Sequence, residues 1–202
     1  MTRTKLCGLW QIRDIVAANE VSPDFVGFVF AQGSTRYVSP EHASALRKLL
    51  SPGIKAVGVF VDESPEMVAA LLNQGIIDLA QLHGHEDEAY IDALRNITDK
   101  PLIKAVRVRT AEDIEEANQS TADHVLLDSG TGTGRAFDWS FLKHMTRPYF
   151  LAGGLTPDNV AAAVRRLRPF AVDVSSGIET EGKKDKAKMT AFQAAVQEVN
   201  DR

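Results

Sequence analysis

The sequence predicts an α/β protein in which residues 1–202 form a single-domain (β/α)8 barrel, the TIM-barrel architecture. Short apolar runs alternate with amphipathic stretches along the whole chain. Eight such units give about 25 residues each, which is near the lower size limit for a closed barrel. Several runs are apolar almost throughout, as in parallel strands that are covered on both faces.

The eight apolar runs are the candidate strands. They span residues 4–9, 24–30, 55–61, 77–82, 101–106, 123–128, 148–152 and 170–174. Residues 56–61 and 171–174 show the pattern most clearly, because neither alternates strictly between apolar and polar side chains. Short runs of this kind are typical of strands buried on both faces, and they favour parallel pairing.

Helix start signals lie between the strands. Ser39, Ser64 and Thr156 each precede a proline, which is favoured in the first turn of a helix. Thr110 and Asp113 form a capping box. The predicted helices span residues 11–19, 40–50, 65–74, 111–118, 138–145, 157–167 and 185–199.

A doubly wound open sheet is the alternative architecture. The barrel is preferred because there are eight β-α units and because no Gly-x-Gly-x-x-Gly motif follows the first strand. The sequence shows no linker, low-complexity stretch or second domain.

Composition narrows the class of protein. Hydrophobic residues make up 44% and charged residues 25%, and the net charge is −4. A sequence-independent nucleic-acid binder would carry a basic face, so no nucleic-acid partner is expected, whereas a small anionic substrate is compatible. A single cysteine forms no internal disulfide, which favours a reducing cytoplasm. We expect no signal peptide and no membrane partner, because no apolar run is long enough.

Two side chains with acid–base chemistry close apolar strands. Cys7 closes the first strand, just before Gly8, and Asp128 closes the sixth. Active sites of (β/α)8 barrels lie at the C-terminal ends of the strands, so this thiol and this carboxylate are candidates for a base and an acid. Taken alone, Cys7 is better explained as a small buried hydrophobe.

Further polar residues follow other strands. Arg36 lies after the second strand, where its planar fork suits a carboxylate, although a surface arginine is an equal reading. Asp62, after the third, is better read as a cap or a solvated loop residue. His83, at the end of the fourth, is a third titratable group or a metal ligand. No second histidine or cysteine stands at ligand spacing, so no metal site is predicted.

Glycine-bearing loops follow the last three strands. Gly153 and Gly154 follow the seventh, and Ser175, Ser176 and Gly177 follow the eighth. Barrels of this kind commonly bind phosphate after strands seven and eight, so these loops predict a phosphate ester ligand, with plain turns as the alternative. A third loop, 130–134, is either a loop tip or a lid over the substrate.

Seven segments in order resemble the phosphoribosylanthranilate isomerases of tryptophan biosynthesis. They are Lys5–Gly8; Gly27–Phe30 with Ser34–Arg36; Val57–Val61; Gln81–Gly84; Leu127 and Asp128 with Gly132–Gly134 and Phe137–Trp139; Leu151–Leu155 with Asn159 and Val160; and Val172–Glu179 with Lys184 and Asp185. The resemblance implies a cofactor-free barrel that converts N-(5-phosphoribosyl)anthranilate into 1-(2-carboxyphenylamino)-1-deoxyribulose 5-phosphate by an Amadori rearrangement.

The same resemblance implies roles for individual residues. Asp128 would be the general acid and Cys7 the general base, and Arg36 would hold the anthranilate carboxylate. The loops at Gly153–Gly154 and Ser175–Gly177 would hold the phosphate. His83 is placed among the substrate-binding residues without an assigned role.

Other readings remain open. Indole-glycerol-phosphate synthase needs a catalytic lysine, for which Lys104 is the one weak candidate. Ribulose-phosphate epimerases need metal-binding histidines that are missing here. A non-catalytic phosphate-binding barrel would be expected to lack Cys7 or Asp128. An isomerase that also accepts a histidine-pathway intermediate stays open, as does the choice between monomer and homodimer.

Overall fold

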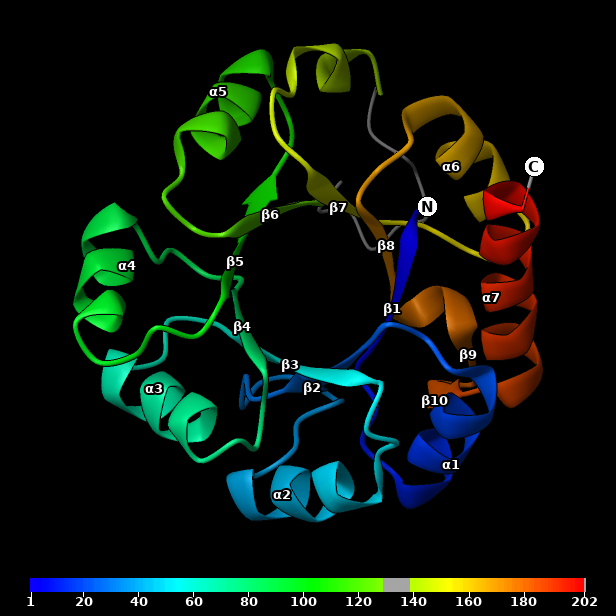
Figure 1. Ribbon diagram of the computed structural model, residues 1–202, viewed down its shortest axis with the longest axis horizontal. Helices are drawn as coiled ribbons and strands as arrows, with labels where there is room; N and C mark the ends of the chain where they lie inside the picture. Colours follow the sequence, from blue (N-terminus) through cyan, green and yellow to red (C-terminus); the bar gives the residue numbers. More distant parts are fainter. Residues whose placement is uncertain (129–138, 202) are drawn as a thin grey trace.

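Eight parallel strands close into a barrel in the order in which they occur along the chain (Figure 1). The computed structural model describes residues 1–128 and 139–201. The strands are β1 (Arg3–Cys7), β2 (Phe25–Val29), β3 (Lys55–Phe60), β4 (Leu79–Leu82), β5 (Leu102–Arg107), β6 (His124–Asp128), β7 (Tyr149–Ala152) and β8 (Ala171–Val174). All eight predicted strands are present. The barrel is closed because β1 pairs with both β2 and β8. Lys5 on β1, for example, lies opposite Phe25 on β2 and opposite Asp173 on β8.

Helices surround the barrel (Figure 1). They are α1 (Ile12–Val21), α2 (Pro40–Leu49), α3 (Pro65–Asn73), α4 (Glu88–Arg95), α5 (Ala111–Gln119), the 3-10 helix η1 (Trp139–His144), α6 (Val160–Leu167) and α7 (Lys186–Asn200). After β8 the chain forms a short 3-10 helix, η2 (Ser176–Ile178), and a hairpin of β9 (Glu179–Thr180) and β10 (Lys183–Lys184). The segment predicted as a helix after the sixth strand is the 3-10 helix η1, and the glycine loop 130–134 lies outside the described residues.

Most helices begin where their capping residues predict. The Ser39 side chain accepts a hydrogen bond from the His42 amide, and Ser64 does the same for Met67. One helix differs: α6 starts at Val160 rather than near 157. The Asn159 side chain accepts from the Thr156 amide at 2.8 Å and donates to the Gly154 carbonyl at 2.8 Å, which holds this stretch as a turn.

Helix α4 was not predicted. Its N-cap is Asp87, whose carboxylate accepts a hydrogen bond from the Tyr90 amide at 2.9 Å. Only two of its eight residues, Ile91 and Leu94, are buried. Such a narrow apolar stripe is a weak helical signal in a sequence.

Side chains alternate between two cores. Along β6, Leu126 packs inside the barrel with residues such as Phe25 and Phe150, whereas Val125 and Leu127 face the surrounding helices. This alternation follows from the two-residue period of a strand. The next inward position after Leu126 is Asp128. The fold therefore turns the last residue of β6 toward the mouth of the barrel.

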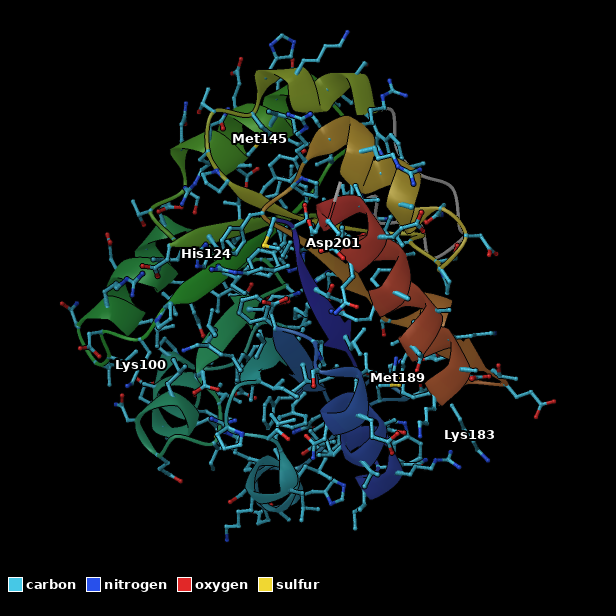
Figure 2. All side chains as sticks on the ribbon, turned by 45° about the vertical axis from the view of Figure 1, so that its right-hand side comes forward. Lys100, His124, Met145, Lys183, Met189 and Asp201 are labelled. Carbon is cyan, nitrogen blue, oxygen red and sulfur yellow. The ribbon has the colours of Figure 1, made fainter. Side chains whose placement is uncertain are left out.

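Helix α7 lies between α1 and α6 and covers β1 (Figure 2). Met189 and Phe192 on this helix are fully buried. The two ends of the chain also meet here, because the Asn200 side chain accepts from the Thr2 amide at 2.8 Å and donates to the Thr2 carbonyl at 2.9 Å. No helix within residues 1–128 and 139–201 has the length and apolar content needed to cross a membrane.

Replacing Phe192 by alanine tests how much α7 contributes to stability. The change removes a fully buried ring, so the free energy of unfolding should fall by about 3–5 kcal/mol. Urea unfolding followed by circular dichroism measures the loss. Gln197→Ala, at an exposed position of the same helix, is the matched control and should stay within about 0.5 kcal/mol. Equal effects of the two changes would contradict the packing described here.

Candidate active site

Cys7 is the last residue of β1 and sits in a small apolar niche at the mouth of the barrel. Its neighbours there are Val29 and Val59. Gly27 on β2 is its direct strand partner, and a Cβ at that position would lie 2.6 Å from the Cys7 sulfur. The missing side chain of Gly27 thus makes room for the thiol, which is only 7% exposed.

Lys5 lies two residues earlier on the same inner face of β1. Its ammonium is fully buried and forms a 2.9 Å ion pair with Asp173 on β8. Burial lowers the pKa of Lys5, but Asp173 and Cys7 raise it by more, and the net shift is upward. Lys5 therefore remains a cation, and its ammonium donates a hydrogen bond to Asp173.

The environment of Cys7 sets its charge state. Burial raises the pKa of the thiol, and the ammonium groups of Lys5 and Lys184 lower it only in part. The carboxylate of Asp173 adds to the rise. The pKa of Cys7 therefore lies above its ordinary value, and the thiol is protonated at neutral pH.

Asp128 ends β6 and contacts a histidine from β4's loop. The Nε2 atom of His83 lies 3.5 Å from Asp128 Oδ2. On the other side of the ring, the Gln81 side-chain amide donates to His83 Nδ1 at 2.7 Å. An accepting Nδ1 places the proton of the neutral ring on Nε2, where it points at the carboxylate. His83 was predicted to bind substrate without an assigned role, and the structure pairs it with Asp128.

A cleft of ≈ 630 Å³ opens beside Asp128 at the C-terminal ends of β4, β5 and β6. Its walls include His83, Lys104 and Arg107. The Lys104 ammonium contacts other residues of this wall: it donates a hydrogen bond to the Gly84 carbonyl at 3.3 Å and lies 3.7 Å from Glu86 Oε2.

The guanidinium of Arg36 forms an ion pair with Glu179. Its Nε and Nη2 atoms donate to the two carboxylate oxygens of Glu179, each at 2.6 Å. Lys184 donates to the same carboxylate at 2.6 Å and to the Ser175 carbonyl at 2.9 Å. Glu179 and Lys184 carried no predicted role, although both belong to the segments that resemble the family. The pair of Arg36 and Glu179 spans 143 residues of chain, which no local pattern reveals.

The loops after β7 and β8 are in direct contact. Gly153 and Gly154 both adopt positive φ angles, of 91° and 65°. A Cβ on Gly177 would lie 1.9 Å from the Leu155 carbonyl oxygen, so no other residue fits there without moving the neighbouring loop. The predicted phosphate loops, including Ser175 and Ser176, are therefore brought together at one side of the barrel mouth.

Asp62 has a structural role in its loop. Its carboxylate accepts from the His85 amide at 2.6 Å and lies 3.0 Å from the His85 ring Nδ1. This agrees with the expectation of a loop residue. Within the described part of the chain, no group of three or more histidine, cysteine or acidic side chains is placed to hold a metal ion.

The charge state of Cys7 is testable in the free protein. Because its pKa is raised mainly by burial, the rate of alkylation by iodoacetamide should climb with pH to a midpoint above about 8.5, the value of an ordinary thiol. Mass spectrometry gives the rate at each pH. Cys7→Ala is the blank, since the chain has no other cysteine. A midpoint below that of an ordinary thiol would show that Lys5 and Lys184 outweigh burial.

Comparison with known proteins bears on the same site. The family model of N-(5'-phosphoribosyl)anthranilate isomerase matches residues 4–195. A curated relative of that name from Lachnoclostridium phytofermentans is 43% identical over 217 residues, covering 98% of this chain and 99% of the relative.

Solved structures agree with the sequence relatives. One, described as monomers of the dimeric phosphoribosylanthranilate isomerase of Thermotoga maritima, superposes with a TM-score of 0.86 at 37% identity and covers 98% of this chain and 100% of its own. Another phosphoribosylanthranilate isomerase, in complex with reduced 1-(o-carboxyphenylamino)-1-deoxyribulose 5-phosphate, has a TM-score of 0.85 at 36% identity with the same coverage. The chain belongs to the N-(5'-phosphoribosyl)anthranilate isomerase family.

Proposed function

We propose that this chain isomerises N-(5'-phosphoribosyl)anthranilate to 1-(2-carboxyphenylamino)-1-deoxyribulose 5-phosphate, with Cys7 as general base and Asp128 as general acid. The reaction is an aldose–ketose isomerisation in tryptophan biosynthesis. One observation carries the residue assignment: a thiol and a carboxylate end β1 and β6 on the inner side of the barrel mouth. A relative binds the reduced product, which supports this substrate class.

Ring opening is the first step, and Asp128 supplies its proton. The carboxylic acid protonates the furanose ring oxygen as the bond from that oxygen to C1′ breaks. The lone pair of the anthranilate nitrogen forms the C=N bond of an iminium. Asp128 becomes a carboxylate, and the His83 ring, whose Nε2 atom lies 3.5 Å from Asp128 Oδ2, is placed to stabilise that charge.

Proton removal from C2′ is the second step, and Cys7 carries it out as a thiolate. The electron pair of the C–H bond forms a C1′–C2′ double bond while the iminium nitrogen is neutralised. The resulting enolamine then tautomerises to the ketone. Burial opposes the thiolate, whereas the ammonium groups of Lys5 and Lys184 favour it by lowering the pKa of Cys7.

The two anionic ends of the substrate have separate sites in this proposal. Arg36 binds the anthranilate carboxylate. The backbone of Gly153, Gly154 and Ser175–Gly177 binds the phosphate, which the positive φ angles and the contact between the two loops support. The net charge of −4 argues against a nucleic-acid partner, and a single cysteine with a biosynthetic activity supports a cytoplasmic location.

Replacing Cys7 by serine should abolish most turnover. A hydroxyl of about the same size is a far weaker base than a thiolate, so kcat should fall by about 10²–10⁴-fold or more. The assay follows the loss of fluorescence of the anthranilate adduct, and circular dichroism checks that the fold is kept. Near-equal rates would leave Cys7 as a packing residue, and a wild-type chain that binds the reduced product without turnover would be a non-catalytic barrel.

Replacing Asp128 by asparagine should block ring opening while preserving binding. The amide keeps the size of the carboxyl group but has no proton to transfer, so kcat should drop by about 10²–10⁴-fold. The dissociation constant of the reduced product, measured by fluorescence titration, should change far less. Full activity in this variant, or loss of binding of the reduced product, would refute the acid assignment.

A further inference from the structure

Glu179 is a buried carboxylate held between two cations. Its side chain is 7% exposed. Arg36 binds both of its oxygens with the Nε–Nη2 edge of the guanidinium, and Lys184 binds one of them at 2.6 Å. Burial raises the pKa of Glu179, but Arg36 and Lys184 lower it by more, so the group is ionised at neutral pH.

The stem of Arg36 crosses the chain directly beside Cys7. A Cβ on Gly8 would lie 2.5 Å from Arg36 Cδ, and Gly8 has a φ of 74°. The absence of a side chain on Gly8 therefore leaves room for the stem of Arg36 next to the proposed base. The carboxylate of Glu179 holds the guanidinium at the end of that stem.

We propose that Glu179 is a positioning residue that fixes Arg36 by one edge and thereby presents the opposite edge to the substrate carboxylate. This inference rests on the proposed function. A guanidinium carries five N–H groups, and Glu179 takes one at Nε and one at Nη2. Two parallel N–H groups, one on Nη1 and one on Nη2, form a second fork that accepts a carboxylate with both oxygens. Arg36 thus binds an internal and an external carboxylate at once.

Displacement is the competing possibility, in which the substrate carboxylate replaces Glu179 on Arg36. The surroundings of Glu179 oppose it. Lys184 is itself 1% exposed and is tied to the Ser175 carbonyl and hydroxyl, so it cannot follow Glu179 into solvent. A displaced Glu179 would stay buried with one of its two cations lost, and such a carboxylate is strongly disfavoured.

Glu179→Gln tests the proposal, because the amide keeps the shape but lacks the charge that holds the guanidinium. Two ligands are compared by fluorescence titration: the reduced product and the same compound without its aromatic carboxylate. The variant should weaken the first by about tenfold or more and raise KM to match. The second should change by less than about twofold, and kcat by less than about threefold.

Glu181→Gln is the matched control, since this exposed glutamate lies in the hairpin between Glu179 and Lys184. It should leave both dissociation constants and KM unchanged. If Glu179→Gln fails to fold, Glu179→Asp keeps the negative charge but shortens the side chain that reaches Arg36. It should weaken only the carboxylate-bearing ligand.

Three outcomes would overturn the inference. Tighter binding of the reduced product by the Gln or Asp variant would mean that Glu179 competes with the substrate. Equal weakening of both ligands would mean a merely structural role, and no change in either would mean that Arg36 needs no positioning. A wild-type chain that binds both ligands equally and shows no turnover would instead refute the proposed function.

Discussion

The buried ion pair between Lys5 and Asp173 joins the first strand to the last inside the barrel. It lies at the seam where the sheet closes, and its lysine side chain is fully buried. Removing one partner of such a pair costs about 3–5 kcal/mol, because the other charge is left without compensation. The charge of the same lysine lowers the pKa of Cys7. The contact that closes the barrel therefore also sets the electrostatics of the thiol.

Three cations gather near Cys7 at the mouth of the barrel. They are Lys5, Lys184 and Arg36, and they lie over β1, β2 and β8. Each of these cations is also tied to a carboxylate, Asp173 or Glu179. Cations without such partners would bind any anion and repel one another. Cations held by buried carboxylates keep their positions, which is what a substrate with two anionic ends requires.

The sequence predicted well what depends on local pattern. The eight strands and most helix starts follow from apolar runs and capping residues. Helix α4 was not predicted because its apolar stripe has only two buried residues. The start of α6 was misplaced because a hydrogen bond from the Asn159 side chain to the Gly154 carbonyl, five residues earlier, outweighs the proline signal.

The partners of the site residues could not be predicted in the same way. Arg36 and Glu179 are 143 residues apart, and Lys5 and Asp173 are 168 apart. Only barrel closure brings such groups together, and the sequence alone gives strand order without side-chain geometry. His83 shows the same limit, since its position after β4 was evident but its contact with Asp128 depends on the neighbouring strands.

The hydrogen bonds between Thr2 and Asn200 have a consequence for how this chain can be joined to others. They join the start of β1 to the end of α7, at the end of the barrel opposite Cys7 and Asp128. A protein fused to either terminus would therefore attach on the face away from substrate entry. A short peptide could also connect the two termini, which would free a surface loop elsewhere to become the new start of the chain.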